Sequence, residues 1–261
     1  MVDPSAASQP PRPPVHRCDV LVIGGGPSGS AAAYWLATRG VDVLVLEKKV
    51  FPREKTCGDG LTPRSVTQLR DMGLENALAG QHRYDGLRAV GFGTELEMRW
   101  PPHKRYPDYG YTITRFDLDS LVARHAEKAG AVLWQGAEAV APLERSTPGS
   151  SDLGAESAVQ ASDGGAVAGR AGGAVAGRAG GAVAGRAGGA TVLDRERGTY
   201  SEVRARYTLV ADGSLSRFGR TLGAERCKVW PQGMALRGYF SSPRHDDAYI
   251  ESHLDIRDEA G

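Results

Sequence analysis

The chain has 261 residues, 41% of them hydrophobic, which is enough to fill the core of one large domain or of one domain and part of another. Its 32 basic and 31 acidic side chains leave a net charge of +1, which excludes a bulk electrostatic attraction to nucleic acid, so we expect no nucleic-acid partner. The three cysteines are widely spaced and lack CxxC or His-rich neighbours, so we expect no disulfide framework, no metal site and a reducing, cytoplasmic compartment.

The amino-terminal part of the chain predicts a disordered tail followed by a strand, a helix and a second strand. Residues 1–16 are rich in Pro, Ser and Ala and contain no apolar segment. An apolar run at 20–23 then ends in glycines, small and apolar residues at 30–39 lead to Gly40, and a second apolar run at 41–46 ends at Glu47. Such a βαβ unit has parallel strands buried on both faces, and it predicts an α/β fold.

Further elements follow a polar loop at residues 48–60. A helix is expected to begin with Thr62 as N-cap and Pro63 at its first position. Two strands are expected at 87–92 and 95–100, joined through Gly93. A helix is expected at 117–128, closed by Gly130. Two more strands, at 131–134 and 207–211, would extend the first sheet.

A glycine-rich repeat interrupts the chain between residues 164 and 190. The unit Gly-Gly-Ala-Val-Ala-Gly-Arg-Ala occurs three times, and 11 of these 27 residues are glycine, so ordering the backbone would cost much entropy. We interpret the repeat as a flexible insertion in a surface hairpin. The alternative is an arm that binds anionic ligands through Arg170, Arg178 and Arg186.

The run Gly24-Gly25-Gly26-Pro27-Ser28-Gly29 has the context of a dinucleotide-binding turn, with a strand before it and a helix after it. In such a turn the first glycine makes the bend, the second lets the backbone approach a pyrophosphate, and the third lets the helix pack on the sheet. Glu47 ends the next strand, where an acid accepts hydrogen bonds from ribose hydroxyls, and Lys48 follows it. All eight residues are predicted to bind the cofactor, the alternative being a glycine turn without ligand. The motif does not separate FAD from NAD.

The segment at residues 51–64, Phe-Pro-Arg-Glu-Lys-Thr-Cys-Gly-Asp-Gly-Leu-Thr-Pro-Arg, resembles the loop after the second strand in the geranylgeranyl reductase family of FAD-dependent oxidoreductases. That family belongs with the aromatic hydroxylase-type flavoproteins. The resemblance implies a Rossmann-like FAD-binding domain, with Cys57, Gly58 and Asp59 beside the isoalloxazine ring and Cys57 as a candidate catalytic thiol. The alternative is that Cys57 only packs near the ring.

Two later segments resemble the same group of flavoproteins. Residues 114–121 are similar to a pattern in which an Arg before a helix contacts FAD, which implies this role for Arg115. The alternative is a solvated Arg115 stabilised by Asp117 or Asp119. Residues 210–217 resemble an Ala-Asp-Gly motif that ends a strand beside the cofactor, which implies that Asp212 binds it and favours FAD over NAD.

Residues 234–240 and 252–255 look like the start of the reductases' β-sheet substrate domain. We therefore expect an FAD-binding domain at 17–225 and the beginning of a substrate domain at 226–261. Because the family continues with a Tyr-x-Trp-x-Phe-Pro segment and a second Gly-Asp motif, we expect this chain to be a truncated form.

The resemblance implies an enzyme that uses FAD to reduce carbon–carbon double bonds in a polyprenyl chain of the geranylgeranyl or menaquinone type. It implies a prenyl lipid or quinone as substrate, NAD(P)H or another reductant as electron donor, and peripheral contact with the inner face of the cell membrane. Two alternatives stay open: an FAD-dependent aromatic-type monooxygenase and a non-catalytic dinucleotide-binding remnant.

Overall fold

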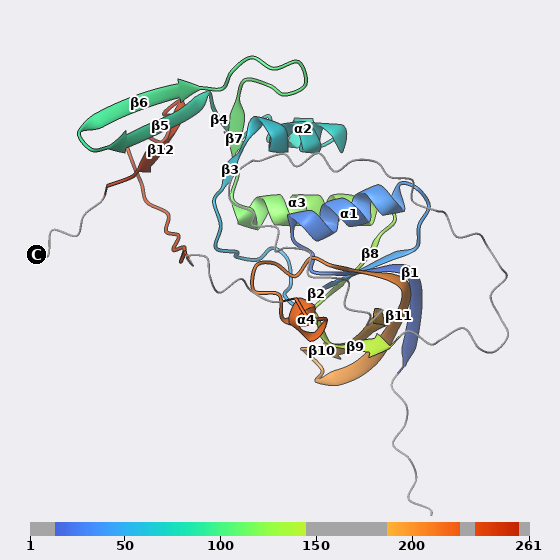
Figure 1. Ribbon diagram of the computed structural model, residues 1–261. Helices are drawn as coiled ribbons and strands as arrows, with labels where there is room; N and C mark the ends of the chain where they lie inside the picture. Colours follow the sequence, from blue (N-terminus) through green and yellow to red (C-terminus); the bar gives the residue numbers. More distant parts are fainter. Residues whose placement is uncertain (1–13, 145–186, 225–232, 256–261) are drawn as a thin grey trace, which may run out of the picture. The chain divides into compact units, whose positions relative to one another are not determined.

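The computed structural model describes residues 14–144, 187–224 and 233–255, and the contacts divide them into two compact units (Figure 1). The first unit contains residues 14–50, 123–144 and 187–224, and the second contains 51–122 and 233–255. The units therefore interleave along the chain, whereas consecutive domains at 17–225 and 226–261 were expected. The assignment of 226–261 to a substrate domain stays a prediction.

A six-stranded sheet forms the centre of the first unit. In spatial order its strands are β8 (Val132–Gln135), β2 (Val43–Glu47), β1 (Val15–Ile23), β11 (Thr199–Val210), β10 (Ala187–Asp194) and β9 (Ala137–Glu144). The four strands from β8 to β11 are parallel, and β10 and β9 are antiparallel additions at one edge. The α/β class and the extension of the sheet by the later strands are confirmed.

Alternate residues of the two central strands are buried on opposite faces of this sheet. Leu21 of β1 joins a core cluster with Phe218 of α4 (Arg217–Thr221), whereas Val22 joins a second cluster with Ala33 of α1 (Pro27–Ala37). Strands covered on both faces must be continuously apolar, which is why these runs were recognisable. β1 begins at Val15, which pairs with Glu202, so residues 15 and 16 of the expected tail belong to a strand. Residues 1–13 lie outside the described residues.

The glycine-rich repeat falls between two antiparallel neighbours, β9 and β10. Its residues 187–190 belong to β10, so the expectation of a flexible insertion was wrong for these four. Small residues are needed there because the backbones lie close: a Cβ on Gly189 would sit 1.9 Å from the Val203 carbonyl oxygen. Arg170, Arg178 and Arg186 lie outside the described residues.

The second unit contains two three-stranded sheets. Their strands are β12 (Tyr249–His253), β5 (Gly86–Gly91) and β6 (Thr94–Arg99) in one, and β3 (Gly60–Leu61), β7 (Gly110–Thr112) and β4 (His82–Tyr84) in the other. The β5–β6 hairpin is confirmed, and its turn residues Phe92 and Gly93 both have positive φ. Helix α2 (Pro63–Asp71) begins after the expected N-cap Thr62, and a short 3-10 helix, η1 (Glu75–Leu78), follows it.

The expectation of a strand at residues 234–240 was wrong. These residues form no strand, and Met234, Leu236 and Phe240 are 89%, 90% and 91% exposed. A β-strand is stabilised by pairing, and within the described chain this segment lies in none of the sheets. The next expected segment is partly confirmed, because β12 pairs in parallel with β5.

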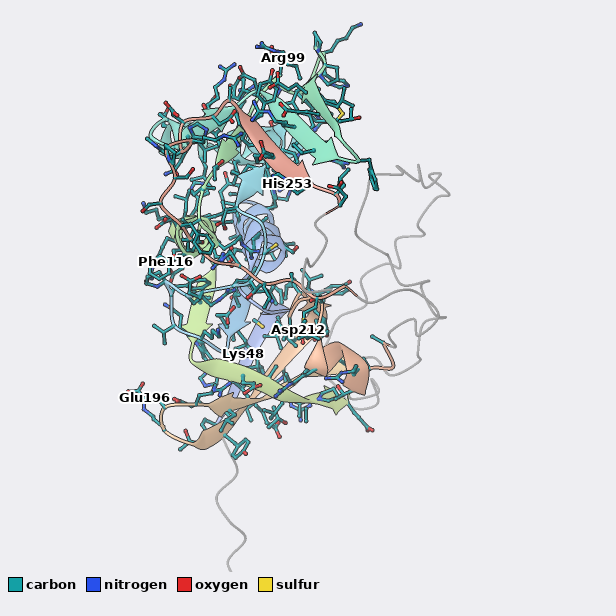
Figure 2. The ribbon with its side chains drawn as sticks, turned by 90° about the vertical axis from the view of Figure 1, so that its left-hand side faces the viewer. Lys48, Arg99, Phe116, Glu196, Asp212 and His253 are labelled. Carbon is teal, nitrogen blue, oxygen red and sulfur yellow. The ribbon has the colours of Figure 1, made fainter. Side chains whose placement is uncertain are left out.

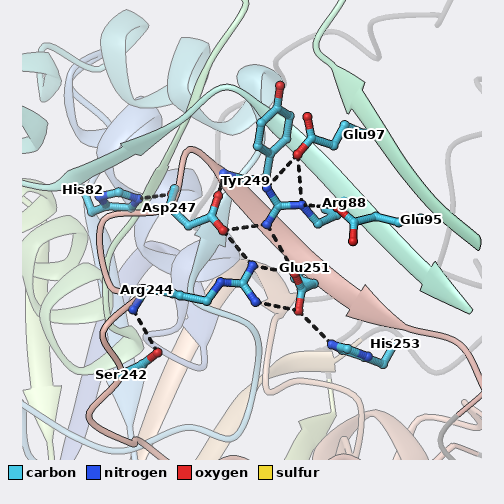
Figure 3. A network of polar contacts seen from close by, with 10 residues as sticks. All are labelled: His82, Arg88, Glu95, Glu97, Ser242, Arg244, Asp247, Tyr249, Glu251 and His253. Atoms are coloured by element: carbon cyan, nitrogen blue, oxygen red, sulfur yellow. Dashed lines mark hydrogen bonds and ion pairs between the residues drawn. The ribbon is translucent and has the colours of Figure 1, made fainter.

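A network of ion pairs attaches β12 to the β5–β6 hairpin (Figure 3). The Arg88 guanidinium on β5 contacts Glu97 on β6 at 2.6 Å and, on its other side, Asp247 at 2.5 Å and Glu251 at 3.2 Å. Arg244 contacts the same two carboxylates at 2.7 and 2.6 Å. Parallel strands so distant in sequence have no turn to set their register, and these charge pairs add specific contacts between them.

Helix α3 (Arg115–Lys128) begins in the second unit and continues into the first. It extends the helix expected at 117–128 by two residues. Ala126 near its end packs with Ala33 of α1 in the second core cluster of the first unit. Among the described residues, no helix combines the length and the apolar character that a membrane crossing requires.

Candidate functional site

The glycine turn lies where β1 ends, next to the end of β11. Gly24 has φ +103°, a conformation that side chains disfavour, and its N–H donates to the Leu46 carbonyl oxygen at 2.8 Å. A Cβ on Gly24 would lie 2.4 Å from the Ala211 carbonyl oxygen. The turn therefore needs glycine both for its dihedral angle and for the close approach of the neighbouring strand.

Helix α1 starts directly after this turn and presents an open amino terminus. Gly26 is the N-cap without a side-chain cap, Pro27 is the first helical residue, and the first turn contains no acidic side chain. A Cβ on Gly29 would lie 1.9 Å from the Gly24 carbonyl oxygen, and the Ser30 hydroxyl donates to the Gly25 carbonyl oxygen at 2.9 Å. The unpaired N–H groups and the dipole of such a helix end favour an anion.

The Glu47 carboxylate lies against the glycine turn. The side chain is only 5% exposed, and its two oxygens accept hydrogen bonds from the Gly25 N–H at 3.1 Å and the Lys49 N–H at 3.0 Å. These two bonds fix the carboxylate at the edge of the turn, where the sequence predicts the contact with the ribose. Lys48 is exposed at the end of β2.

Asp212 comes two residues after β11, which neighbours β1 on the side opposite to β2 and Glu47. Figure 2 labels Asp212 together with Lys48, which follows β2. One carboxylate oxygen, Oδ2, accepts the Phe218 N–H at 3.2 Å. The other, Oδ1, is buried and has no hydrogen-bond partner in the described part of the chain. A buried acceptor without a donor is costly, so this oxygen is suited to a ligand hydroxyl that enters the turn.

The second unit contains the other predicted site residues. Cys57 and Gly58 are exposed, and nothing lies within 4 Å of a Cβ added to Gly58. Asp59 accepts a hydrogen bond from the Arg115 N–H at 3.0 Å. Arg115 is only 8% exposed, so it is not the solvated arginine of the alternative interpretation.

Arg115 pairs with Asp119, one of the two partners that the alternative interpretation offered, one helical turn away. Its Nε and Nη2 atoms donate to the two Asp119 oxygens at 2.7 and 3.0 Å, whereas Asp117 bonds Thr114. Burial alone lowers the pKa of Arg115, but the hydrogen bond and charge of Asp119 outweigh burial, and the pKa stands above its ordinary value. The guanidinium is therefore permanently charged.

Sequence reasoning offered Asp119 as a partner of Arg115 but did not include Arg53. Asp119 is fully buried and also accepts a hydrogen bond from Arg53 Nη1 at 3.0 Å. The spacing of Arg115 and Asp119, four residues apart in a helix, was a signal for their pairing. The contact with Arg53 had no such signal, because 66 residues separate it from Asp119.

The structure thus brings the predicted residues into two groups, one in each unit. The first unit holds the glycine turn, Glu47, Lys48 and Asp212, and the second holds Cys57, Gly58, Asp59 and Arg115. Within residues 14–144, 187–224 and 233–255, no cluster of three or more His, Cys, Asp or Glu side chains has a metal-binding arrangement.

Comparison with known proteins identifies the ligand class of this arrangement. Residues 17–153 match the FAD binding domain family. The chain belongs to this family. FAD is therefore the dinucleotide, as the loop and Ala-Asp-Gly segments predicted.

The relatives of this FAD-binding chain include a menaquinone reductase from Mycobacterium tuberculosis, 38% identical over 243 residues, which are 93% of the chain and 49% of the relative. The chain thus spans about half the length of that relative.

Two solved structures share the fold. The myxobacterial chondrochloren halogenase CndH has TM-score 0.60 and 23% identity, covering 79% of the chain and 39% of the halogenase. A geranylgeranyl bacteriochlorophyll reductase-like protein from Thermoplasma acidophilum has TM-score 0.56 and 24% identity, covering 81% of the chain and 43% of that protein. The hydroxylase-type flavoprotein fold is confirmed.

The residues of the first unit fit FAD on three observations. The amino end of α1 carries no acidic side chain, the turn around Gly24 and Gly29 has no room for a Cβ, and the buried Asp212 Oδ1 lacks a protein donor among the described residues. Diphosphate oxygens suit the helix end, and ribose or ribityl hydroxyls suit the carboxylates of Glu47 and Asp212. The individual roles of these residues stay predictions.

Proposed function

We propose that the protein is an FAD-dependent oxidoreductase that reduces carbon–carbon double bonds in a polyprenyl chain of the menaquinone or geranylgeranyl type. The observation that carries this proposal is the 38% identity with a menaquinone reductase over 93% of the chain. Membership of the FAD binding domain family supports the cofactor on which the reaction depends.

Reduced FAD supplies a hydride for such a reaction, and NAD(P)H or another two-electron reductant restores the cofactor. The chain's own contribution is to bind and orient. We propose that the turn at residues 24–29 holds the diphosphate, that Glu47 and Lys48 bind the adenosine side, and that Asp212 binds a cofactor hydroxyl. Cys57, Gly58, Asp59 and Arg115 are proposed for the flavin side. Because an isolated alkene is unpolarised, orientation and exclusion of water are what a protein can add.

An anaerobic stopped-flow experiment tests the proposed reaction. The photoreduced protein is mixed with menaquinone, flavin reoxidation is followed by visible absorbance, and the lipid is analysed by mass spectrometry after exposure to air. Air returns a hydroquinone ring to the quinone, whereas a reduced prenyl double bond keeps two additional hydrogens. The expected result is a lipid heavier by two hydrogens, which flavin-free protein does not produce.

Three outcomes would overturn the proposal. Reoxidation without added hydrogens in the prenyl chain would assign the flavin to another acceptor. Oxygen-dependent conversion of a phenol would favour an FAD-dependent monooxygenase. A colourless protein that takes up no FAD would favour a non-catalytic remnant.

We also propose peripheral contact with the inner, cytoplasmic face of the cell membrane, because menaquinones and prenyl lipids reside in bilayers. Exposed apolar side chains on the β5–β6 hairpin support it: Phe92, Leu96 and Met98 are 77%, 55% and 42% exposed. Co-sedimentation with liposomes is expected for the wild-type protein and should weaken when all three residues become serine. Equal sedimentation of both proteins contradicts the assignment of this hairpin.

A further inference from the structure

We propose that Asp119 and Asp59 are positioning residues of the flavin side of the site. Together they fasten both ends of the loop at residues 51–60 to the first two turns of α3, so that Cys57 and Gly58 are held in one arrangement. The residues Arg53, Asp59, Arg115 and Asp119 are called the α3 clamp below. That the ordered loop serves flavin binding rests on the proposed function, whereas the ordering of the loop by the clamp does not.

The first end of the loop is fixed by Asp119. This carboxylate is 0% exposed and accepts hydrogen bonds from Arg115 Nε at 2.7 Å, Arg115 Nη2 at 3.0 Å and Arg53 Nη1 at 3.0 Å. The Arg53 guanidinium also lies over the Phe51 ring, 4.9 Å from its centre. A buried carboxylate is stable only with such charge-assisted partners, so these side chains have little freedom to rearrange.

The second end is fixed by Asp59. Its Oδ1 accepts the Arg115 N–H at 3.0 Å, at the amino terminus of α3, and its main-chain oxygen accepts the Ile113 N–H at 2.9 Å. The carboxylate also accepts hydrogen bonds from Arg237 Nη1 at 3.2 Å and the Tyr239 hydroxyl at 2.9 Å. These three donors to the carboxylate are protein groups. We therefore assign Asp59 to positioning rather than to direct contact with the cofactor.

The apex between these ends is open to a ligand. Cys57 and Gly58 are exposed, and a Cβ on Gly58 would touch nothing within 4 Å. Cys57 is also one of the groups that raise the pKa of Arg115, so this thiol interacts with the guanidinium that Asp119 orients. Holding a loop in its binding conformation before the ligand arrives avoids the entropy cost of ordering it on binding. The two carboxylates, Asp59 and Asp119, thus give the apex a defined geometry without contacting the ligand themselves.

Three measurements test the clamp in Asp119→Asn and Asp59→Asn proteins. They are amide hydrogen exchange of residues 53–60 and Cys57 alkylation rate, both in flavin-free protein, and FAD affinity by fluorescence titration. Both variants keep the side-chain shape but lose the charge. We expect exchange at 53–60 to rise and FAD affinity to fall by about tenfold or more, the effect of losing one charge-assisted hydrogen bond. Cys57 alkylation should also change.

Asp117→Asn is the matched control. Asp117 lies in the same helical turn but is exposed and bonds the Thr114 hydroxyl at 2.6 Å, so the variant removes a charge near the helix end without touching the loop. All three measurements should stay within about twofold of wild type. A role in general stability would raise exchange throughout the second unit. A positioning role confines the rise to 53–60 and shifts the visible spectrum of bound flavin.

Wild-type exchange, alkylation and FAD affinity in the Asp119→Asn protein would overturn the proposal. If that variant does not fold, Arg53→Gln decides, because it removes one attachment of the loop and leaves the Arg115–Asp119 pair. Unchanged exchange at 53–60 in Arg53→Gln overturns the clamp. If the wild-type protein takes up no FAD, the proposed function fails, and the two flavin-free measurements still decide whether the clamp exists.

Discussion

Replacing Gly29 with alanine tests the close packing of α1 on the glycine turn. The added Cβ would lie 1.9 Å from the Gly24 carbonyl oxygen, whereas ordinary contacts begin at 3.4 Å, so the two atoms must move apart by the difference. The backbone resists this shift, because the Gly24 N–H is bonded to Leu46 at 2.8 Å and the Ser30 N–H to Gly26 at 2.9 Å. We expect a loss of about 2–3 kcal/mol in the free energy of unfolding, as for overpacked interiors. For a chain of this size that lowers the melting temperature by about 4–12 °C.

Thermal unfolding followed by circular dichroism measures the loss of stability in the Gly29→Ala protein. Opening the turn also displaces the amino end of α1, so the variant should retain little FAD, which the flavin content after purification measures. Gly80→Ala is the matched control, because Gly80 is exposed and a Cβ there meets nothing within 4 Å. It should stay within about 0.5 kcal/mol of wild type. A Gly29→Ala protein with wild-type melting temperature and full flavin content would refute the steric reasoning.

Three further predictions concern charge and burial. Glu47→Gln should weaken FAD binding about tenfold, because a charged acceptor becomes a neutral one, and an unchanged dissociation constant in a fluorescence titration would contradict this. The Arg244 hydrogen bond lowers the pKa of Glu251 from 4.5 to about 2, so its stabilisation of β12 is present above 4.5 and is lost as the pH falls toward 2. The protection factors of the β12 amides, taken against unprotected amides at the same pH, should fall over this interval, and unchanged protection factors would show that the pair contributes nothing. Burial raises the pKa of Cys18 to about 11, so at neutral pH it should be alkylated far more slowly than exposed Cys57, and equal rates by peptide mass spectrometry would exclude this difference.

The sequence by itself determined the elements that obey local rules. The apolar runs of β1 and β2, the glycines between β1 and α1, and the acid that ends β2 are recognisable because each lies within a short window of periodic or turn-forming residues. The β5–β6 hairpin was predicted on the same basis, since the turn requires a positive φ that Gly93 supplies. These features identify the dinucleotide turn before any tertiary contact is considered.

Only the tertiary structure decided which distant segments meet. It placed β11 beside β1, so that Asp212 lies next to Gly24, and it buried Asp119 against Arg53 from the loop. It also included residues 187–190 in a strand and left 234–240 without one, both against expectation. Local propensity does not predict such outcomes. Pairing between remote strands depends on the closure of long loops and on how well whole sheet and helix faces fit together, and no short window of sequence contains this information.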